Sequence, residues 1–448
     1  MLRNTLLLCL SFTLLSGSAN ARTFIGQTQV RTSPGSQDAS SQFEINSTTK
    51  GLLVPRLTTT QKNNIVSPAN GLIVFDTTLG LLNFYSSGWN SVPSATSSND
   101  SRNRIINGAM DIWNSGTSFT SVANGTYTAE MFVYNTAGTS AVHTLARSTD
   151  VPTLAESGFQ SSYSLHADVT TADAAVAAGD AAGIAYRMEG YDYTQIKGRT
   201  VTLSFWVKDD KTGTHCVAFR NNGGGTPDRS YVAEYSISAG DTWEKKNITI
   251  TLDPSGGTDN FTNGIGLIIQ FTLIAGSTFQ TTAGSWQTGN YTGTSNCVNS
   301  VDDVNNDFKI AQVMLNPGST AEAFTRAGLT IGGDRVLSQR YFEKSYDPDT
   351  TPGTATYVGA IAFVCGDSGQ SISIPVQFKV TKANTPTFTY YAPGTGTASR
   401  ITDSTAGDVT GRIYNAVAVG LNSTGVETLA ACTATRYYSI HWTSNARL

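Results

Sequence analysis

Charged residues are scarce in this chain. Lys, Arg, Asp and Glu make up only 14% of the 448 residues, and the formal net charge is −4, whereas roughly 25% of residues are charged in an average soluble domain. The sequence therefore has neither the basic balance typical of nucleic-acid binding nor the cationic face that attracts an anionic membrane. We predict no nucleic-acid partner and no membrane insertion.

Long apolar runs are also lacking after residue 15. Residues 1–21 combine Arg3, a short apolar run over 6–15 and the small-residue motif Ala19-Asn20-Ala21. A helix that spans a bilayer needs roughly 20 apolar residues, and this shorter pattern is that of a cleavable signal peptide. We expect a mature chain that starts near Arg22 and is exported to the periplasm, the cell surface or the extracellular medium.

Cysteine is rare as well. Four cysteines follow the predicted signal peptide: Cys216, Cys297, Cys365 and Cys432. Export permits disulfides, and the predicted domain boundaries favour Cys216 with Cys297 and Cys365 with Cys432; free buried thiols are the alternative. The spacing lacks the closely spaced ligand pairs of a zinc site.

Glycine, serine, threonine and asparagine are abundant, which favours short strands and tight turns over long helices. Apolar and polar residues alternate with a period of two over 201–208, 248–252, 267–273 and 372–380. Pro375 lies inside the last of these runs, which predicts an edge strand or a bulge. We predict an all-β chain without internal repeats.

The mature chain divides into three predicted units. Residues 22–100 contain a predicted helix at 58–65, strands at 72–75 and 81–85, and a polar linker. A unit of this size has too little core to be stable alone, so we expect it to associate with other copies. Residues 101–326 are predicted to form a large β-sandwich, and residues 327–448 a further β unit that begins with a helix near 333–344.

Several stretches resemble bacteriophage tail fibres. Residues 50–89 resemble a short module of phage structural proteins. Five further stretches resemble the jelly-roll domain of tail fibres, which is similar to a carbohydrate-binding module. They are NRIINGAMDIWNSGTSFT (103–120), YTAEMFVY (127–134), SYSLHADV (162–169), VTLSFWVK (201–208) and FKIAQVMLNPGSTAEAF (308–324). LSQRYFEKSYD (337–347) and YYSIHWTSNARL (437–448) are similar to the C-terminal tip domain of the same proteins.

The resemblance implies a homotrimer with a β-sandwich tip domain at its distal end and a fibre shaft or anchor protein at its N-terminal end. A signal peptide is unusual in a phage fibre, which assembles in the cytoplasm. The combination resembles the mosaic adhesive trimer fibres of predatory bacteria, which implies recognition of a host or prey cell.

Carbohydrate recognition uses aromatic faces framed by hydrogen-bonding side chains. Trp286, Gln287 and Tyr291 lie in a polar loop and are the leading candidates, whereas Trp206 shares a strand face with Ser204 and Lys208 and alternatively packs beneath a loop or a second subunit. Further candidates are Arg229, Tyr231 and Tyr391. We expect His441 to be a structural histidine at the trimer axis.

We predict no cofactor and no metal ion. Asn107 and Asp111 match the first segment of a structural calcium site, but Ala311 and Gln312 stand where an acidic ligand is expected, and calcium needs six or more oxygen ligands. The sequence predicts a binding protein rather than an enzyme: an exported trimeric adhesin for cell-surface polysaccharide. The alternatives are a structural fibre component without a specific ligand and a glycan depolymerase, which needs two paired carboxylates.

Overall fold

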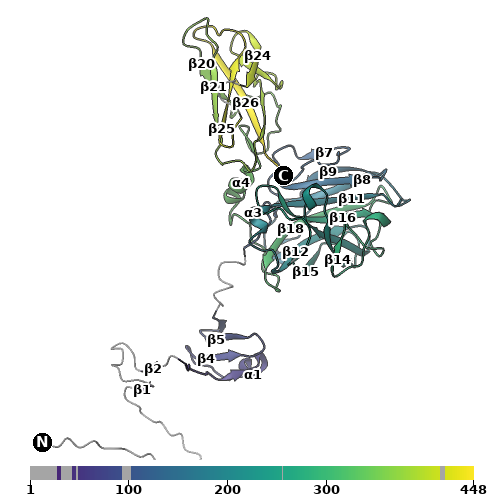
Figure 1. Cartoon of the computed structure of the whole chain (residues 1–448), viewed down its shortest axis with the longest axis vertical. Coiled ribbons are helices and arrows are strands. Elements are labelled where there is room, and N and C mark those ends of the chain that lie inside the picture. The colour runs from purple at the N-terminus through teal and green to yellow at the C-terminus, as the bar shows by residue number, and fades with distance from the viewer. Residues whose placement is uncertain (1–27, 32–42, 47–48, 93–101, 255, 414–418) are drawn as a thin grey trace, which may run out of the picture. The chain divides into compact units, whose positions relative to one another are not determined.

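The computed structural model describes residues 28–31, 43–46, 49–92, 102–254, 256–413 and 419–448. The chain contains two compact units, Met1–Thr96 and Ser97–Leu448 (Figure 1). The predicted signal peptide at 1–21 lies outside the described residues. Within the described part of the chain, no helix has the length and apolar character required to cross a membrane. The all-β prediction is confirmed, since strands dominate both units.

The first unit contains a small sheet and one helix. Strands β3 (Arg56–Leu57), β4 (Ile73–Asp76), β5 (Leu81–Tyr85) and β6 (Trp89–Ser91) pair in that order, and β1 (Thr28–Arg31) pairs in parallel with β2 (Phe43–Asn46). Helix α1 (Thr59–Asn63) begins at a capping box in which the side chains of Thr58 and Gln61 bond each other's backbone N–H groups. The predicted helix and strands are therefore present.

The two faces of this sheet have an unusual distribution of polarity. The ammonium of Lys62, from α1, is buried and lies 2.9 Å from Asp76 Oδ2 and 3.1 Å from Asn83 Oδ1. Apolar pairs occupy the other face, where Ile73 lies opposite Phe84 and Phe75 opposite Leu82. Ile73, Phe84 and Leu82 are 45%, 37% and 36% exposed. In a single chain, the apolar face of this sheet is thus open to solvent.

The second unit begins with a β-sandwich of two six-stranded antiparallel sheets (Figure 1). Sheet I has the order β15 (Glu244–Thr251), β12 (Thr200–Asp209), β18 (Asp307–Pro317), β10 (Ser164–Thr171), β9 (Val142–Ser148) and β7 (Ser118–Phe119). Sheet II has the order β17 (Trp286–Thr288), β14 (Arg229–Ile237), β13 (Gly213–Arg220), β16 (Ile265–Ala275), β11 (Ala181–Glu189) and β8 (Phe132–Ala137). Short helices α2 (Leu154–Ser157) and α3 (Gly190–Tyr193) and 3-10 turns η1 (Gly223–Gly225) and η2 (Ser277–Phe279) lie between strands.

The main core lies between these sheets because alternate residues of each strand point inward. Phe205 of sheet I packs edge-to-face on Phe271 of sheet II, with ring centroids 4.9 Å apart. The alternation seen in the sequence over 201–208 and 267–273 corresponds to β12 and β16. The residues of β16 between the inward-facing ones point to the outer face of sheet II.

The C-terminal strands form one eight-stranded sheet after helix α4 (Ile331–Gln339). Its strands are β19 (Phe342–Lys344), β20 (Ile361–Val364), β21 (Ser373–Gln377), β22 (Thr387–Tyr391), β23 (Arg400–Asp403), β24 (Gly407–Ile413), β25 (Ser423–Thr428) and β26 (Tyr437–Asn445). Strand β26 pairs with β19 and β22 over one half and with β20 and β23 over the other. Pro375 lies in β21, which ends the sheet, as the sequence predicted for an edge strand.

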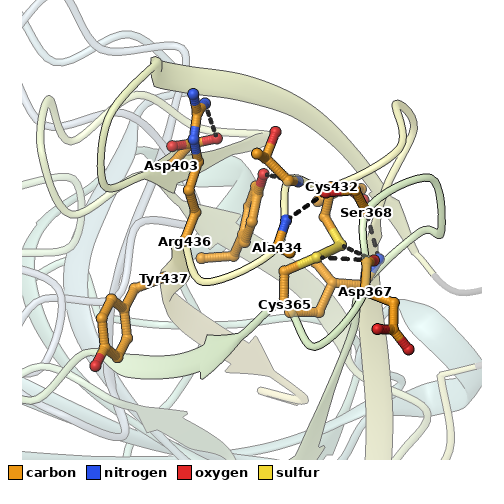
Figure 2. The surroundings of a disulfide bond; sticks show 12 residues. Cys365, Asp367, Ser368, Asp403, Cys432, Ala434, Arg436 and Tyr437 are labelled. Carbon is orange, nitrogen blue, oxygen red and sulfur yellow. Dashed lines mark hydrogen bonds and ion pairs between the residues drawn. A yellow bond between two sulfur atoms is a disulfide. The ribbon is translucent and has the colours of Figure 1, made fainter.

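One disulfide joins Cys365 to Cys432 beside the core of these strands. Figure 2 shows the bond next to the turn that contains Asp367 and Ser368, with the Ala434 N–H donating to Ser368 Oγ. The expected second disulfide is wrong for this structure, since Cys216 and Cys297 are free thiols. They lie in one apolar cluster on sheet II and interact without a covalent bond.

Candidate functional site

The outer face of sheet II carries a row of side chains that crosses three strands. Arg187 of β11 lies opposite Ile268 of β16, and Ile268 lies opposite Arg220 of β13. In the next row, Gln270 lies between two alanines, Ala185 and Ala218. Both alanines are fully buried, Ala185 in a cluster with Val133 and Ala218 in a cluster on which Tyr291 packs. The register therefore places two guanidinium groups and an amide around a hollow.

This hollow is a groove of about 350 Å³. Loops at both ends of the sheet complete its walls, including the residues next to η1 and η2. Its polar lining is rich in amides and contains Asn124, Asn135, Asn222, Gln270, Asn290, Arg187, Arg220, Thr136, Thr226 and Thr292. Ile265, Ile268 and Phe279 supply apolar surface. None of the described lining residues is Asp or Glu.

Arg220 is the most deeply placed charge in the groove, with 6% of its surface exposed. Its Nη1 donates to Asn290 Oδ1 at 2.6 Å and its Nη2 to Gln270 Oε1. Burial and the like charge of Arg187 lower the pKa of Arg220 to about 10. The guanidinium is still charged at neutral pH, and it has no ion-pair partner among the described residues.

The groove also has more buried donors than acceptors. The Nε atoms of Arg187 and Arg220 and the Oγ1 atom of Thr292 are buried without a hydrogen-bond partner among the described residues. Arg187 Nη1 donates to Leu448 O at 2.6 Å and to the Tyr127 hydroxyl at 3.2 Å. Unsatisfied donors are uncommon in folded proteins. The groove is therefore suited to a ligand rich in hydrogen-bond acceptors.

Four of the predicted ligand residues come together at the edge of sheet II. Tyr231 of β14 lies opposite Trp286 of β17, and Arg229 lies opposite Thr288, one register step from Gln287. The Tyr231 and Trp286 rings are 5.8 Å apart and pack against the main core. Trp286 Nε1 donates to Thr251 O at 2.9 Å, and Arg229 Nε lies 2.7 Å from Asp253 Oδ2. Their contacts join β17 to the sandwich.

Trp206 is buried, with 8% of its surface exposed, so the prediction that it binds a ligand is wrong. The segment between β9 and β10 crosses this face of sheet I. Asp150 of that segment lies 3.0 Å from Lys208 Nζ and 3.1 Å from Lys309 Nζ. The alternative considered for Trp206, packing beneath a loop, matches its burial.

The remaining aromatic candidates are half-buried. Tyr291 packs on the apolar cluster of Cys216, Ala218 and Val232, and its neighbours Asn290 and Thr292 line the groove instead. Tyr391 packs edge-to-face on Tyr346, with ring centroids 6.0 Å apart.

His441 is buried within the single chain. It stacks on Tyr346 and bonds Ser345 Oγ and Thr356 O. Its described partners, Tyr346, Ser345 and Thr356, all belong to its own chain.

The residues considered for calcium have structural partners. Asn107 Nδ2 donates to the carbonyls of Ile112 and Glu130, and Asp111 forms an ion pair with Arg326. These contacts hold the first segment of the second unit.

One other group among the described residues has the composition of a metal site. His166, Asp168 and Asp307 bring one ligand atom each within 4.8 Å of one another. Asp307 is already bound by His166 Nε2 at 2.8 Å and by Lys309 Nζ at 3.3 Å. Although burial raises the pKa of Asp307, His166 and Lys309 lower it overall. This carboxylate is therefore poorly suited to act as a general acid.

The comparisons with known proteins address the first unit most directly. Residues 26–103 match the model of the phage tail like trimerisation region. The tail-fibre resemblance of the N-terminal module is thus confirmed. No curated protein sequence matches the chain.

Similar solved structures cover less than half of the chain. They include the enzymatically active domain of bacteriophage CBA120 tailspike protein 4. That match has 19% sequence identity and a TM-score of 0.25, and it covers 44% of this chain and 21% of that chain. A CBM4 structure matches with 13% sequence identity and a TM-score of 0.26, and the match covers 48% of this chain and 99% of that chain. A putative sugar binding protein from Bacteroides thetaiotaomicron matches with 12% sequence identity and a TM-score of 0.29, and the match covers 48% of this chain and 100% of that chain.

Proposed function

We propose that this protein is an exported, trimeric fibre-tip adhesin that binds surface glycan of a target cell. The observation that carries the proposal is the groove on sheet II, which combines amides, two guanidinium groups and apolar side chains. Saccharides present many hydroxyl oxygens on rings with apolar C–H faces, and a site of this composition matches both. A signal peptide at 1–21 would deliver the chain outside the cytoplasm.

Self-association is supported by the match to a trimerisation region and by the first unit itself. The open face formed by Ile73, Phe75, Leu82 and Phe84 is apolar, whereas the face beneath α1 holds an ion pair. Exposed apolar patches of this kind mark protein interaction sites. Three chains joined here would present three grooves, and this multivalency would strengthen binding to a dense cell-surface glycan. The N-terminal end would connect to a fibre shaft or anchor protein.

The proposed mechanism is binding without turnover. Glycoside hydrolysis uses a pair of carboxylates that flank the scissile bond, and the described lining of the groove offers no carboxylate. Amides and guanidinium groups can hold a sugar but are not general acids or bases at neutral pH. The groove thus favours an adhesin over a depolymerase.

A glycan array with the purified full chain tests this function. We expect reproducible binding to a restricted set of glycans, and we expect Gln270→Ala to weaken it because the amide lies in the groove floor. Lys245→Gln, an exposed change in β15 of sheet I, is the control. Absence of binding to every glycan would refute the adhesin and favour a structural fibre component. Release of reducing ends from a bound polysaccharide would instead identify a depolymerase.

A further inference from the structure

We infer that the groove on sheet II selects a saccharide that carries a carboxylate over its neutral counterpart. The inference rests on the proposed glycan-binding function and adds the chemical class of the ligand. Glycan binding alone would require only hydrogen bonds and apolar contacts. The groove also contains charge of a single sign, and that charge is the basis of the inference.

The positive charge comes from opposite sides of one row of side chains. Arg187 and Arg220 flank Ile268, each on a strand hydrogen-bonded to β16. They are close enough for the charge of Arg187 to lower the pKa of Arg220. Arg187 Nη1 already donates to Leu448 O at 2.6 Å, so the charge that lacks an anionic neighbour is that of Arg220. A ligand anion beside Arg220 would offset the repulsion between the two like charges.

The protein itself does not supply this anion to Arg220. Its two described partners, Asn290 and Gln270, are neutral amides. A buried cation without a carboxylate partner is costly, and buried arginines are usually paired with one. The unsatisfied Nε atoms of Arg187 and Arg220 show the same excess of donors. A binding site that gains its missing charge from the ligand accounts for both observations.

The remaining lining limits what kind of anion fits. The planar, delocalised guanidinium matches a carboxylate through paired hydrogen bonds. The amides of Asn135 and Asn222 extend the polar wall for ring hydroxyls, and Ile268 and Phe279 offer apolar contact. A volume of about 350 Å³ is at the small end of ligand sites. The geometry points to a short stretch of an acidic glycan, such as one or two uronic or nonulosonic acid residues.

The first test varies the charge of the ligand and leaves the protein unmodified. The full chain is titrated with a panel of uronate and nonulosonate oligosaccharides, each beside its neutral methyl ester, and with sulfated oligosaccharides of similar length. Esterification removes the charge and keeps the sugar. We expect at least one carboxylated glycan to bind roughly tenfold or more tightly than its ester, and we expect this preference to weaken as salt increases.

Two groove variants and a matched control locate the effect. Arg220→Gln removes the buried charge, and Gln270→Glu places a carboxylate beside Arg220; both should abolish the preference for the acid. Lys245→Gln removes one positive charge from exposed β15 of sheet I and should leave the preference intact. Thermal unfolding of each variant identifies any that fails to fold, and the ester comparison on the unmodified protein does not depend on the variants.

The outcomes separate this inference from the proposed function. Equal binding of acids and esters would overturn the charge selection and leave glycan binding in place. Preference for sulfated glycans alone would overturn the assignment of a carboxylate. Failure of every acidic, neutral and sulfated glycan to bind would overturn both.

Discussion

Removal of the disulfide between Cys365 and Cys432 should strongly destabilise the C-terminal strands. The two cysteines are 67 residues apart in the sequence. For a loop of that length, the chain-entropy relation gives about 4 kcal/mol of stabilisation at 25 °C. We therefore expect the double variant Cys365→Ala with Cys432→Ala to lose about 4 kcal/mol of unfolding free energy, since an alanine at each site removes the cross-link without burying a new polar group.

Urea unfolding of the C-terminal strands measures this loss, with tryptophan fluorescence of buried Trp442 as one probe. The control is Cys297→Ala, which removes a free thiol that packs on the apolar cluster of sheet II and leaves the disulfide intact. We expect the control to change stability far less than the double variant. A double variant as stable as the unmodified chain would refute the argument that the cross-link acts by restricting the unfolded state.

Two further predictions concern self-association and pH. Phe84→Asp should convert the associated protein to monomers in light scattering, because it places a charge on the open apolar face. Thr60→Asp, on the exposed surface of helix α1 at the opposite face of the sheet, should not; an unchanged mass for Phe84→Asp would contradict the proposed interface. Burial lowers the pKa of His143 to about 4 from 6.5. The folded form therefore binds fewer protons than the unfolded chain between these values, and stability should fall by about 3 kcal/mol as the pH drops from 6.5 to 4. His143→Gln should lack that part of the pH dependence in urea titrations, and an identical slope would contradict it.

The sequence predicted the strands better than the site. Alternation over 201–208 and 372–380 identified β12 and the edge strand β21, because a half-buried strand leaves a period-two signature. The same alternation placed Trp206 on the outer face of sheet I. It could not show that a segment from 149–163 crosses that face, since such coverage depends on contacts between residues distant in sequence.

The groove was missed for a related reason. Arg187, Arg220 and Gln270 belong to three different strands and become neighbours only through the strand order of sheet II. The sequence pattern instead indicated Tyr231 and Trp286 as aromatic platforms, and both residues pack against the core. A local signal did exist for Gln270, which lies inside the long and mostly apolar strand β16.

The ion pair beneath α1 has a consequence for assembly. In the first unit, the ion pair of Lys62 and Asp76 lies between helix α1 and the sheet, where a small soluble domain usually has apolar side chains. The apolar side chains of Ile73, Phe75, Leu82 and Phe84 lie on the open face of the sheet instead. A newly made chain therefore gains most of the hydrophobic stabilisation of this segment only when it meets other copies. The folding of the first unit should depend on protein concentration. The sandwich buries its hydrophobic core within one chain, and it can therefore fold without other copies.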